Sequence, residues 1–364
     1  MFAQKCNLYD GDISLEKARF LDPETISKWS DEYKLIDGDI LVNSTGTGTV
    51  GRTRLFHSDV LGDYPFVVPD SHVSVVRSFE EIESKFVLAF LSSDYGQTYI
   101  EDNLAGSTNQ KELYIGVLDN MQFPLPPHEE QFRIVTTVDK WFSLIDTLES
   151  AKEDLQTSIA QAKSKILDLA IHGKLVPQDT NDEPAIELLK RINPKFTPCD
   201  NAHYPLVLPT TWCLSYVKDI IDNPSCKPFQ IMQSDINDTG HTPVVSQSSN
   251  YIEGYSDRKD CVFKNKNAVL IFGDHTRILK YVDFDFIVGA DGVKIIIPYI
   301  SVKYSYYALQ FIINGMRNRG YARHYSVLAN SIIPVPPHAE QQRIVSKIEE
   351  LFEVLDEIQK SIEV

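Results

Sequence analysis

The sequence lacks the features that would place it in a membrane or in an oxidising compartment. No apolar run approaches the roughly 20 residues that span a bilayer, and no signal peptide opens the chain, so we expect a cytoplasmic protein without membrane contact. The cysteines are odd in number and scattered without paired spacing, which argues against a disulfide framework and against a zinc site. They are Cys6, Cys199, Cys213, Cys226 and Cys261.

Familiar catalytic motifs are missing as well. The chain contains no Gly-x-Ser-x-Gly elbow, no phosphate-binding loop ending in Gly-Lys-Ser/Thr and no Asn-Pro-Pro-aromatic methyltransferase motif. The run "GTGTVG" at residues 46–51 has the glycine spacing of a dinucleotide-binding loop, but neither the helix nor the acidic residue that such a site requires follows it. We interpret this run as a hairpin turn and predict a chain without catalytic residues.

A repeated segment is the strongest positive feature. "PLPPHEEQFRIV" at residues 124–135 returns as "PVPPHAEQQRIV" at residues 334–345, which is an offset of 210 residues. Each copy opens a stretch whose apolar residues alternate spacings of four and three, a pattern typical of coiled coils. The seams include Ile134, Val138, Trp141, Ile145 and Leu148 in the first copy, and Ile344, Ile348, Leu351 and Leu355 in the second.

The shared heptad phase of the two seams favours helices that pack on each other and dock partner proteins. Two amphipathic helices in the cores of separate domains are the alternative interpretation. At about 1.5 Å per residue the first helix would reach roughly 58 Å and the second roughly 31 Å, so we expect rods and not domain cores. Glycine at position 173 is expected to end the first helix.

The remaining sequence predicts two globular domains of one plan. A chain of 364 residues with 43% hydrophobic residues can bury two ordinary cores. "FVVPDSHVSVV" at residues 66–76 aligns with "FIVGADGVKII" at residues 286–296, and helical stretches follow near residues 86–99 and 304–316. A common scaffold with different loops would suit the recognition of two different ligands by one fold.

A net charge of −16 argues against a nucleic-acid-binding protein, because neutralising phosphates requires lysine and arginine. The charges are unevenly distributed, however. Residues 292–339 contain no aspartate or glutamate and interleave basic residues with tyrosines, whereas acidic residues gather on the predicted helices. The acid-free run is therefore a candidate for DNA contact, and an ordinary solvated surface above core tyrosines is the alternative.

The two proline segments, together with "LDLAIHGKLVPQDTNDEPAIELLKRI" at residues 167–192, resemble the specificity subunit of type I restriction-modification enzymes. The resemblance extends over essentially the whole chain. It implies an α/β (α+β) fold with a pseudo-twofold internal repeat, in which long antiparallel helices separate two target-recognition domains. The implied domains are residues 1–123, 124–173, 174–203, 204–333 and 334–364, namely a first recognition domain, a central helix, a linker, a second recognition domain and a terminal helix.

The resemblance also implies partners. Each recognition domain would clamp one half of a bipartite, asymmetric site in double-stranded DNA, and the helices would act as a ruler. Two methyltransferase subunits, which bind S-adenosylmethionine, would dock on the helices, and endonuclease-translocase subunits would join them. By this analogy the residues that could face a DNA groove are Arg52, Arg54, Asn109, Gln110 and Lys111 in the first domain, and Arg317, Arg319, Arg323 and His324 in the second.

One departure from the family pattern raises an alternative. Its Leu-Pro-x-x-Trp-like opening of a recognition domain is present only once, as "LPTTW" at residues 208–212, so we expect the first domain to be incomplete at its N-terminus. A truncated or phase-variable variant could act mainly as a helical assembly scaffold without reading DNA independently. The acid-free run distinguishes the two hypotheses, because a pure scaffold gains nothing from it.

Overall fold

The structure is a computed structural model that describes residues 1–46, 48–107, 110–199, 208–289, 291–317, 320 and 322–363, except the side chains of Ser107 and Gln110. The chain divides into two compact units, Met1–Ser150 and Ala151–Val364. The cysteines are free thiols, three of them buried. Within the described ranges, none of the helices is sufficiently long and apolar to traverse a bilayer.

The first unit is built around a three-stranded antiparallel sheet in the order β2-β1-β3. Strand β1 (Ile40–Asn43) is completely buried because both of its faces are covered. Leu41 packs into one core with Phe2 and Phe56, while Ile40 and Val42 pack into another beneath the helices. The other elements are β2 (Thr53–Leu55), β3 (Val73–Val76), α1 (Ser84–Ser92), α2 (Asp94–Asp102), the hairpin β4 (Ala105–Ser107) and β5 (Gln110–Glu112), and α3 (Ile115–Asp119).

The second unit repeats this plan. Its central strand β11 (Val269–Gly273) lies between β12 (Leu279–Val282) and β14 (Val293–Pro298), antiparallel to both, and is again fully buried. Helix α6 (Val302–Gly315) then follows β14 as α1 follows β3. The shared plan predicted from the sequence is therefore confirmed. One difference is that the first predicted helical stretch is two helices, because Ser93 ends α1 and caps α2.

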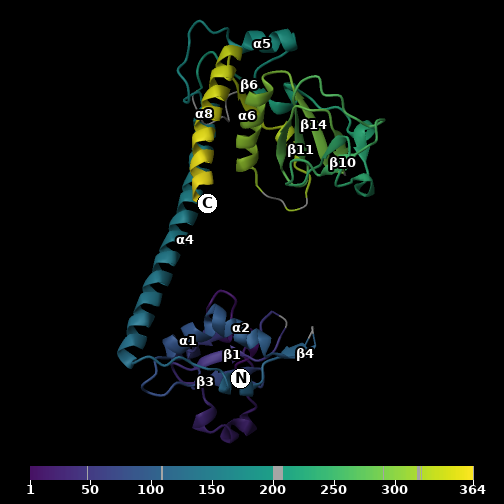
Figure 1. The fold of residues 1–364 in the computed structure, drawn as a ribbon. Coiled ribbons are helices and arrows are strands. Elements are labelled where there is room, and N and C mark those ends of the chain that lie inside the picture. Colours follow the sequence, from purple (N-terminus) through teal and green to yellow (C-terminus); the bar gives the residue numbers. More distant parts are fainter. Residues whose placement is uncertain are drawn as a thin grey trace. The chain divides into compact units, whose positions relative to one another are not determined.

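Further strands surround this sheet in the second unit (Figure 1). Strand β7 extends the sheet to the order β12-β11-β14-β7, and a second sheet has the order β10-β9-β13-β8. The remaining elements are α5 (Ala185–Ile192), β6 (Cys213–Tyr216), β7 (Ile221–Asp222), β8 (Gln230–Ile231), β9 (Thr242–Val245), β10 (Gly254–Ser256), β13 (Ile287–Gly289), α7 (Tyr325–Ala329) and β15 (Ile332–Val335).

The long helices begin at equivalent residues, α4 (His128–Ile171) at the first proline segment and α8 (His338–Ile362) at the second. A buried glutamine in the first turn of each long helix hydrogen-bonds to the globular domain before it. The Gln131 side chain accepts from the Glu83 backbone N–H at 3.0 Å and donates to the Pro126 carbonyl at 3.0 Å. Gln341 repeats both bonds with Ser301 and Pro336, at 3.0 and 2.9 Å.

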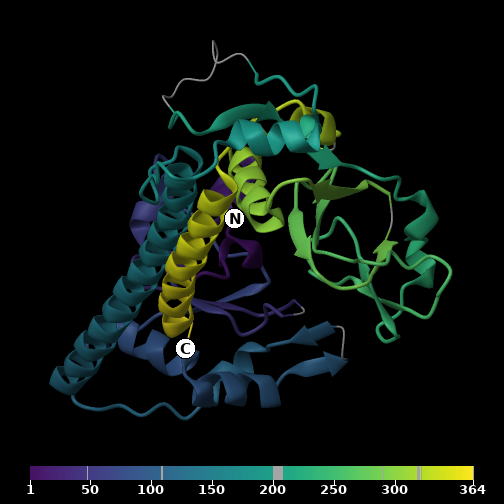
Figure 2. The same cartoon turned by 90° about the horizontal axis from the view of Figure 1, so that it is seen from above.

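Helices α4 and α8 pack together in an antiparallel sense within the second unit (Figures 1 and 2). Lys163 pairs with Asp356, and later residues of α4 share a core with earlier residues of α8. The shared core includes Leu167, Ala170 and Ile171 from α4, and Ile344, Val345 and Ile348 from α8. The predicted packing is confirmed, but the expectation that these helices avoid domain cores is wrong for the start of α8, whose apolar residues complete the core of the second unit.

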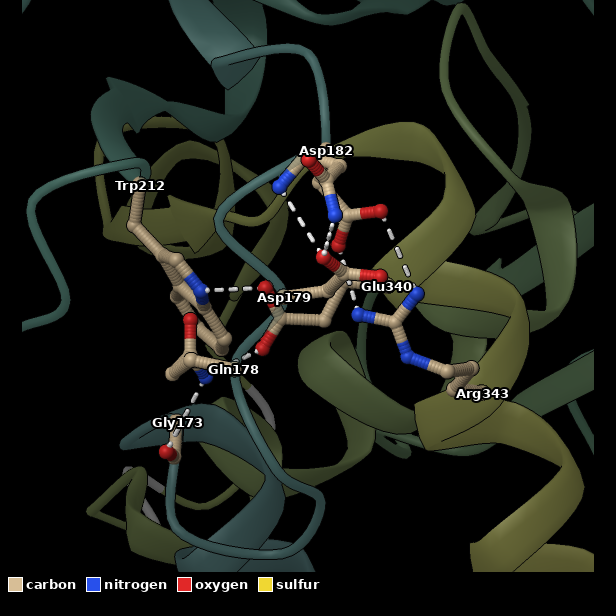
Figure 3. A network of polar contacts seen from close by, with 8 residues as sticks. Gly173, Gln178, Asp179, Asp182, Trp212, Glu340 and Arg343 are labelled. Atoms are coloured by element: carbon tan, nitrogen blue, oxygen red, sulfur yellow. Dashed lines mark hydrogen bonds and ion pairs between the residues drawn. The ribbon is translucent and has the colours of Figure 1, made fainter.

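A polar network holds the segment between α4 and the second domain against α8 (Figure 3). Gly173, with φ 65°, follows the end of α4 as predicted. The fully buried Glu340 carboxylate accepts from the Trp212 indole N–H at 2.9 Å and from the Gln178 amide at 2.5 Å, while Arg343 pairs with Asp182 at 2.5 Å. Burial raises the pKa of Glu340, and the two hydrogen bonds oppose that rise.

Candidate nucleic-acid interface

The glycine-rich run after β1 forms a hairpin turn, as predicted, although Thr47 lies outside the described residues. Strands β1 and β2 are antiparallel, with Val42 opposite Thr53. Gly46 has φ 105°, a region that favours glycine, and an added Cβ there would lie 2.2 Å from the Thr49 hydroxyl. The run therefore needs glycine for its turn geometry.

The turn after the central strand anchors a second loop in each unit. In the first unit the Leu113 N–H donates to the Ser44 carbonyl at 2.8 Å, at the end of the β4–β5 hairpin. In the second unit the His324 N–H donates to the Asp274 carbonyl at 2.9 Å, at the end of the segment 316–324. These two loops carry most of the residues predicted to face DNA. Neither anchor has a sequence pattern that would predict it.

In the first unit, the structure brings three of the predicted residues together. Arg52, Arg54 and Lys111 line one surface hollow, with Tyr9 and Gln97 among its other walls. Lys111 is exposed, and Arg52 lies over the Tyr9 ring at 5.7 Å. Asn109 and the side chain of Gln110 lie outside the described residues.

Arg54 makes more hydrogen bonds within the chain than Arg52, whose guanidinium, among the described residues, donates to the Asn7 carbonyl alone, at 2.9 Å. Its guanidinium donates to the backbone carbonyls of Thr53, Leu8 and Tyr9, at 2.7, 2.8 and 3.2 Å. Burial, and secondarily the nearby Arg52, lowers the pKa of this guanidinium. Arg54 therefore supports the wall of the hollow, whereas Lys111 extends from it.

In the second unit, Arg317 and Arg323 are exposed, and neither makes a hydrogen bond or ion pair with a residue that the structure describes. Arg319 lies outside the described residues. The prediction that His324 faces a groove is wrong, because its side chain is completely buried. The Asp274 carboxylate accepts from the His324 backbone N–H at 2.8 Å, and the imidazole Nδ1 lies 3.1 Å from the Asp274 carbonyl oxygen.

Several tyrosines of the acid-free run belong to the core. Tyr304 is fully buried and donates its hydroxyl proton to the Pro334 carbonyl at 2.7 Å. Burial raises the pKa of Tyr307 to about 12 and also raises the pKa of Tyr306. The interpretation of core tyrosines is thus correct for this part of the run, while Arg317 and Arg323 are exposed at the surface.

The predicted docking residues fall into three groups, which are exposed, partly buried and fully buried. Trp141, Ile145 and Leu148 on α4 are 61%, 45% and 62% exposed, which is unusual for large apolar side chains. Ile134, Val138, Leu351 and Leu355 are partly buried. Ile344 and Ile348 are fully buried, so the prediction that they dock another subunit is wrong. The chain itself covers them.

No group of three or more histidine, cysteine, aspartate or glutamate side chains in the described part of the chain is placed to hold a metal ion. The geometry instead offers exposed cations on anchored loops and exposed apolar residues on a long helix. Cations on loops suit contact with phosphates or base edges. Exposed apolar residues at coiled-coil spacing suit contact with another protein.

Comparison with known proteins agrees with this geometry. The type I restriction modification DNA specificity domain matches residues 5–157 and 209–364. The EcoEI specificity subunit of Escherichia coli is 24% identical over 436 residues, covering 93% of this chain and 72% of that subunit. The EcoAI specificity subunit of Escherichia coli is 25% identical over 428 residues, covering 92% of this chain and 71% of that subunit.

Solved structures share the fold. The HsdS subunit from Thermoanaerobacter tengcongensis matches with a TM-score of 0.53 and 16% identity, over 92% of this chain and 78% of that one. A second match is a chain from a structure on the complex assembly and conformational transition of the type I R-M system. It has a TM-score of 0.60 and 17% identity, over 91% of this chain and 78% of that one.

Specificity subunits carry no cofactor of their own, because S-adenosylmethionine is bound by the methyltransferase subunit. The family model matches two segments of the chain, and the relatives match almost its whole length. Both findings agree with the internal repeat found in the sequence. The chain belongs to the type I restriction-modification DNA specificity family and is the non-catalytic DNA specificity subunit of such a system.

Proposed function

We propose that this chain reads a bipartite, asymmetric site in double-stranded DNA, one half with each globular unit. The main support for this proposal is a hydrogen bond that occurs in both units. In each unit, a loop with exposed basic residues is hydrogen-bonded to the turn after the central strand. Two similar scaffolds with different loops suit two different half-sites. The strongest candidates for DNA contact are Lys111 in the first unit and Arg317 and Arg323 in the second.

Arg52 completes the proposed contact surface of the first unit, because it shares the hollow with Lys111. An arginine can pair with guanine through two hydrogen bonds, and both arginine and lysine can also bind a phosphate without contacting a base. Asn109, Gln110 and Arg319 remain candidates for DNA contact on the basis of the sequence alone. Arg54 and His324 serve the architecture of the loops in this proposal.

The long helices would set the separation of the half-sites and dock two methyltransferase subunits. The exposed Trp141 and Leu148 support docking on the first half of α4. Endonuclease-translocase subunits would then join this assembly, and the complex would act in the cytoplasm. Half-site spacing in other DNA-binding proteins likewise follows the geometry of the protein.

Methylome sequencing of cells with and without the gene tests this proposal. Loss of one bipartite methylated motif on deletion, and its return on complementation, is the expected result. A variant lacking both exposed arginines, Arg317→Ala with Arg323→Ala, should relax only one half of the motif. An unchanged methylome after deletion would refute DNA reading and leave a scaffold as the remaining function.

A further inference from the structure

The turn between β11 and β12, residues 274–278, is hydrogen-bonded to other parts of the second unit as well as to the segment 316–324. The Asp274 N–H donates to the Gly292 carbonyl at 2.7 Å, and the Thr276 hydroxyl donates to the Gln247 carbonyl at 2.6 Å. The Gln247 side chain in turn donates to the Asp291 carbonyl at 2.8 Å. Because two separate segments hold it, and are themselves hydrogen-bonded to each other, this turn has a fixed position in the second unit.

The turn holds the segment 316–324 at both ends. At the far end, one carboxylate oxygen of Asp274 accepts from the backbone N–H groups of His324 and Tyr325, at 2.8 and 2.7 Å. At the near end, the Arg277 guanidinium donates to the Met316 carbonyl at 2.8 Å. Asp274 is 3% exposed. Burying a carboxylate without hydrogen-bond donors costs folding free energy, so the two backbone N–H groups stabilise the buried Asp274 and keep His324 and Tyr325 beside it.

Arg277 has an unusual backbone conformation for its residue type. Its φ is 62°, and among the described residues it is the single non-glycine residue with a positive φ. Side chains disfavour this region, and the cost is sustained where the surroundings fix the conformation, often at functional sites. Here the conformation accompanies a guanidinium that reaches the segment carrying Arg317.

Both anchors bind backbone atoms of the segment, and the side chains of Arg317 and Arg323 stay exposed, although the His324 imidazole also lies 3.1 Å from the Asp274 carbonyl oxygen. The first unit uses the same principle, since the Ser44 carbonyl holds the backbone of Leu113. A scaffold that holds only backbone atoms can keep a loop in place whatever side chains the loop carries. Such a loop can change its specificity without losing its position.

We propose that Asp274 and Arg277 are positioning residues for DNA recognition, which hold Met316 and His324 so that the neighbouring Arg317 and Arg323 meet the DNA in one geometry. This inference rests on the proposed function of that segment. Positioning affects the difference in affinity between right and wrong sequences, because a misplaced arginine still attracts phosphates but no longer matches one base.

The test uses the full chain, co-expressed with its methyltransferase subunit, and a pool of duplexes with randomised sequence. The enriched duplex and a scrambled duplex then give a selectivity ratio and a salt dependence for each variant. Asp274→Ala and Arg277→Gly should each lower the selectivity ratio about tenfold, the loss expected from about one hydrogen bond, with the salt slope unchanged. Glycine tolerates the positive φ, so a loss in Arg277→Gly reflects the missing guanidinium.

Conservative variants and a matched control sharpen the test. Asp274→Asn keeps the acceptor oxygen and Arg277→Lys keeps a donor, so both should retain most of the selectivity. Arg258→Ala removes an exposed arginine that pairs with Asp260 and should change nothing. Arg277→Gly keeps the test decisive if Asp274→Ala fails to fold.

Arg317→Ala and Arg323→Ala, measured in parallel, separate the two proposals. If they reduce selectivity while Asp274→Ala and Arg277→Gly do not, positioning is refuted and DNA reading stands. If all four variants retain wild-type selectivity, or the wild type enriches no duplex, both proposals fail for this segment. A uniform loss of affinity for all duplexes, with a changed salt slope, would also contradict positioning.

Discussion

The Glu340 network offers the sharpest test of how the second unit holds together. Replacing Glu340 with alanine leaves the Trp212 indole N–H, in a side chain that is 8% exposed, without its acceptor. An unsatisfied buried donor costs about 1 to 3 kcal/mol. Gln178 is exposed, so water can satisfy its amide after the change. We therefore expect Glu340→Ala to lower the free energy of unfolding by about 2 kcal/mol.

Urea unfolding followed by circular dichroism measures this loss. With a slope of about 2 kcal/mol per molar urea, the midpoint of the affected transition should fall by about 1 M. Glu130→Ala is the matched control, because Glu130 is the equivalent residue of the first copy and is exposed. Its substitution should cost less than about 0.5 kcal/mol. Equal costs for the two substitutions would refute the role assigned to the buried network.

Three further predictions follow from the same structure. Because the folded-state pKa of Glu340 is raised, its contribution to stability is complete below the unfolded value of about 4.5 and is lost as pH rises through the folded value; Glu340→Gln should remove this pH dependence from unfolding curves. Seven residues inserted after Leu155 add about 10.5 Å and rotate the following helix by about 20°, so methylome sequencing should find a changed spacer with unchanged half-sites. Trp141→Ser with Leu148→Ser should abolish co-purification of the methyltransferase subunit while thermal unfolding stays the same, whereas retained co-purification would exclude this docking face.

Much of the fold could be predicted because its causes are local or periodic. The start of α4 and the start of α8 follow from proline and from the heptad pattern, and the antiparallel pairing followed from the resemblance to a family. Partner choice along the heptad pattern could not be predicted. The same spacing buries Ile344 in the core of its own unit and leaves Trp141 exposed, because periodicity identifies an apolar face without identifying what covers it.

The candidate site was predicted less completely. Of the residues that the family resemblance proposed for DNA contact in the second unit, Arg317 and Arg323 are exposed, whereas His324 is buried. The anchors were missed because their acceptors are backbone carbonyls and a carboxylate about 50 residues away along the chain. Such contacts have no pattern in the sequence. The repeated Gln131 and Gln341 could have been recognised, since a polar residue kept in both copies beside a proline segment invites a structural explanation.

Equivalent residues of an internal repeat can have unequal roles, and Glu130 and Glu340 demonstrate why. Both occupy the third position of a long helix, and both are followed by a glutamine that fastens that helix to its domain. Glu340 alone is buried, because Trp212 and Gln178 come from a segment that packs over the start of α8. The two copies therefore share the glutamine anchor, whereas the environment of each glutamate decides what its substitution costs.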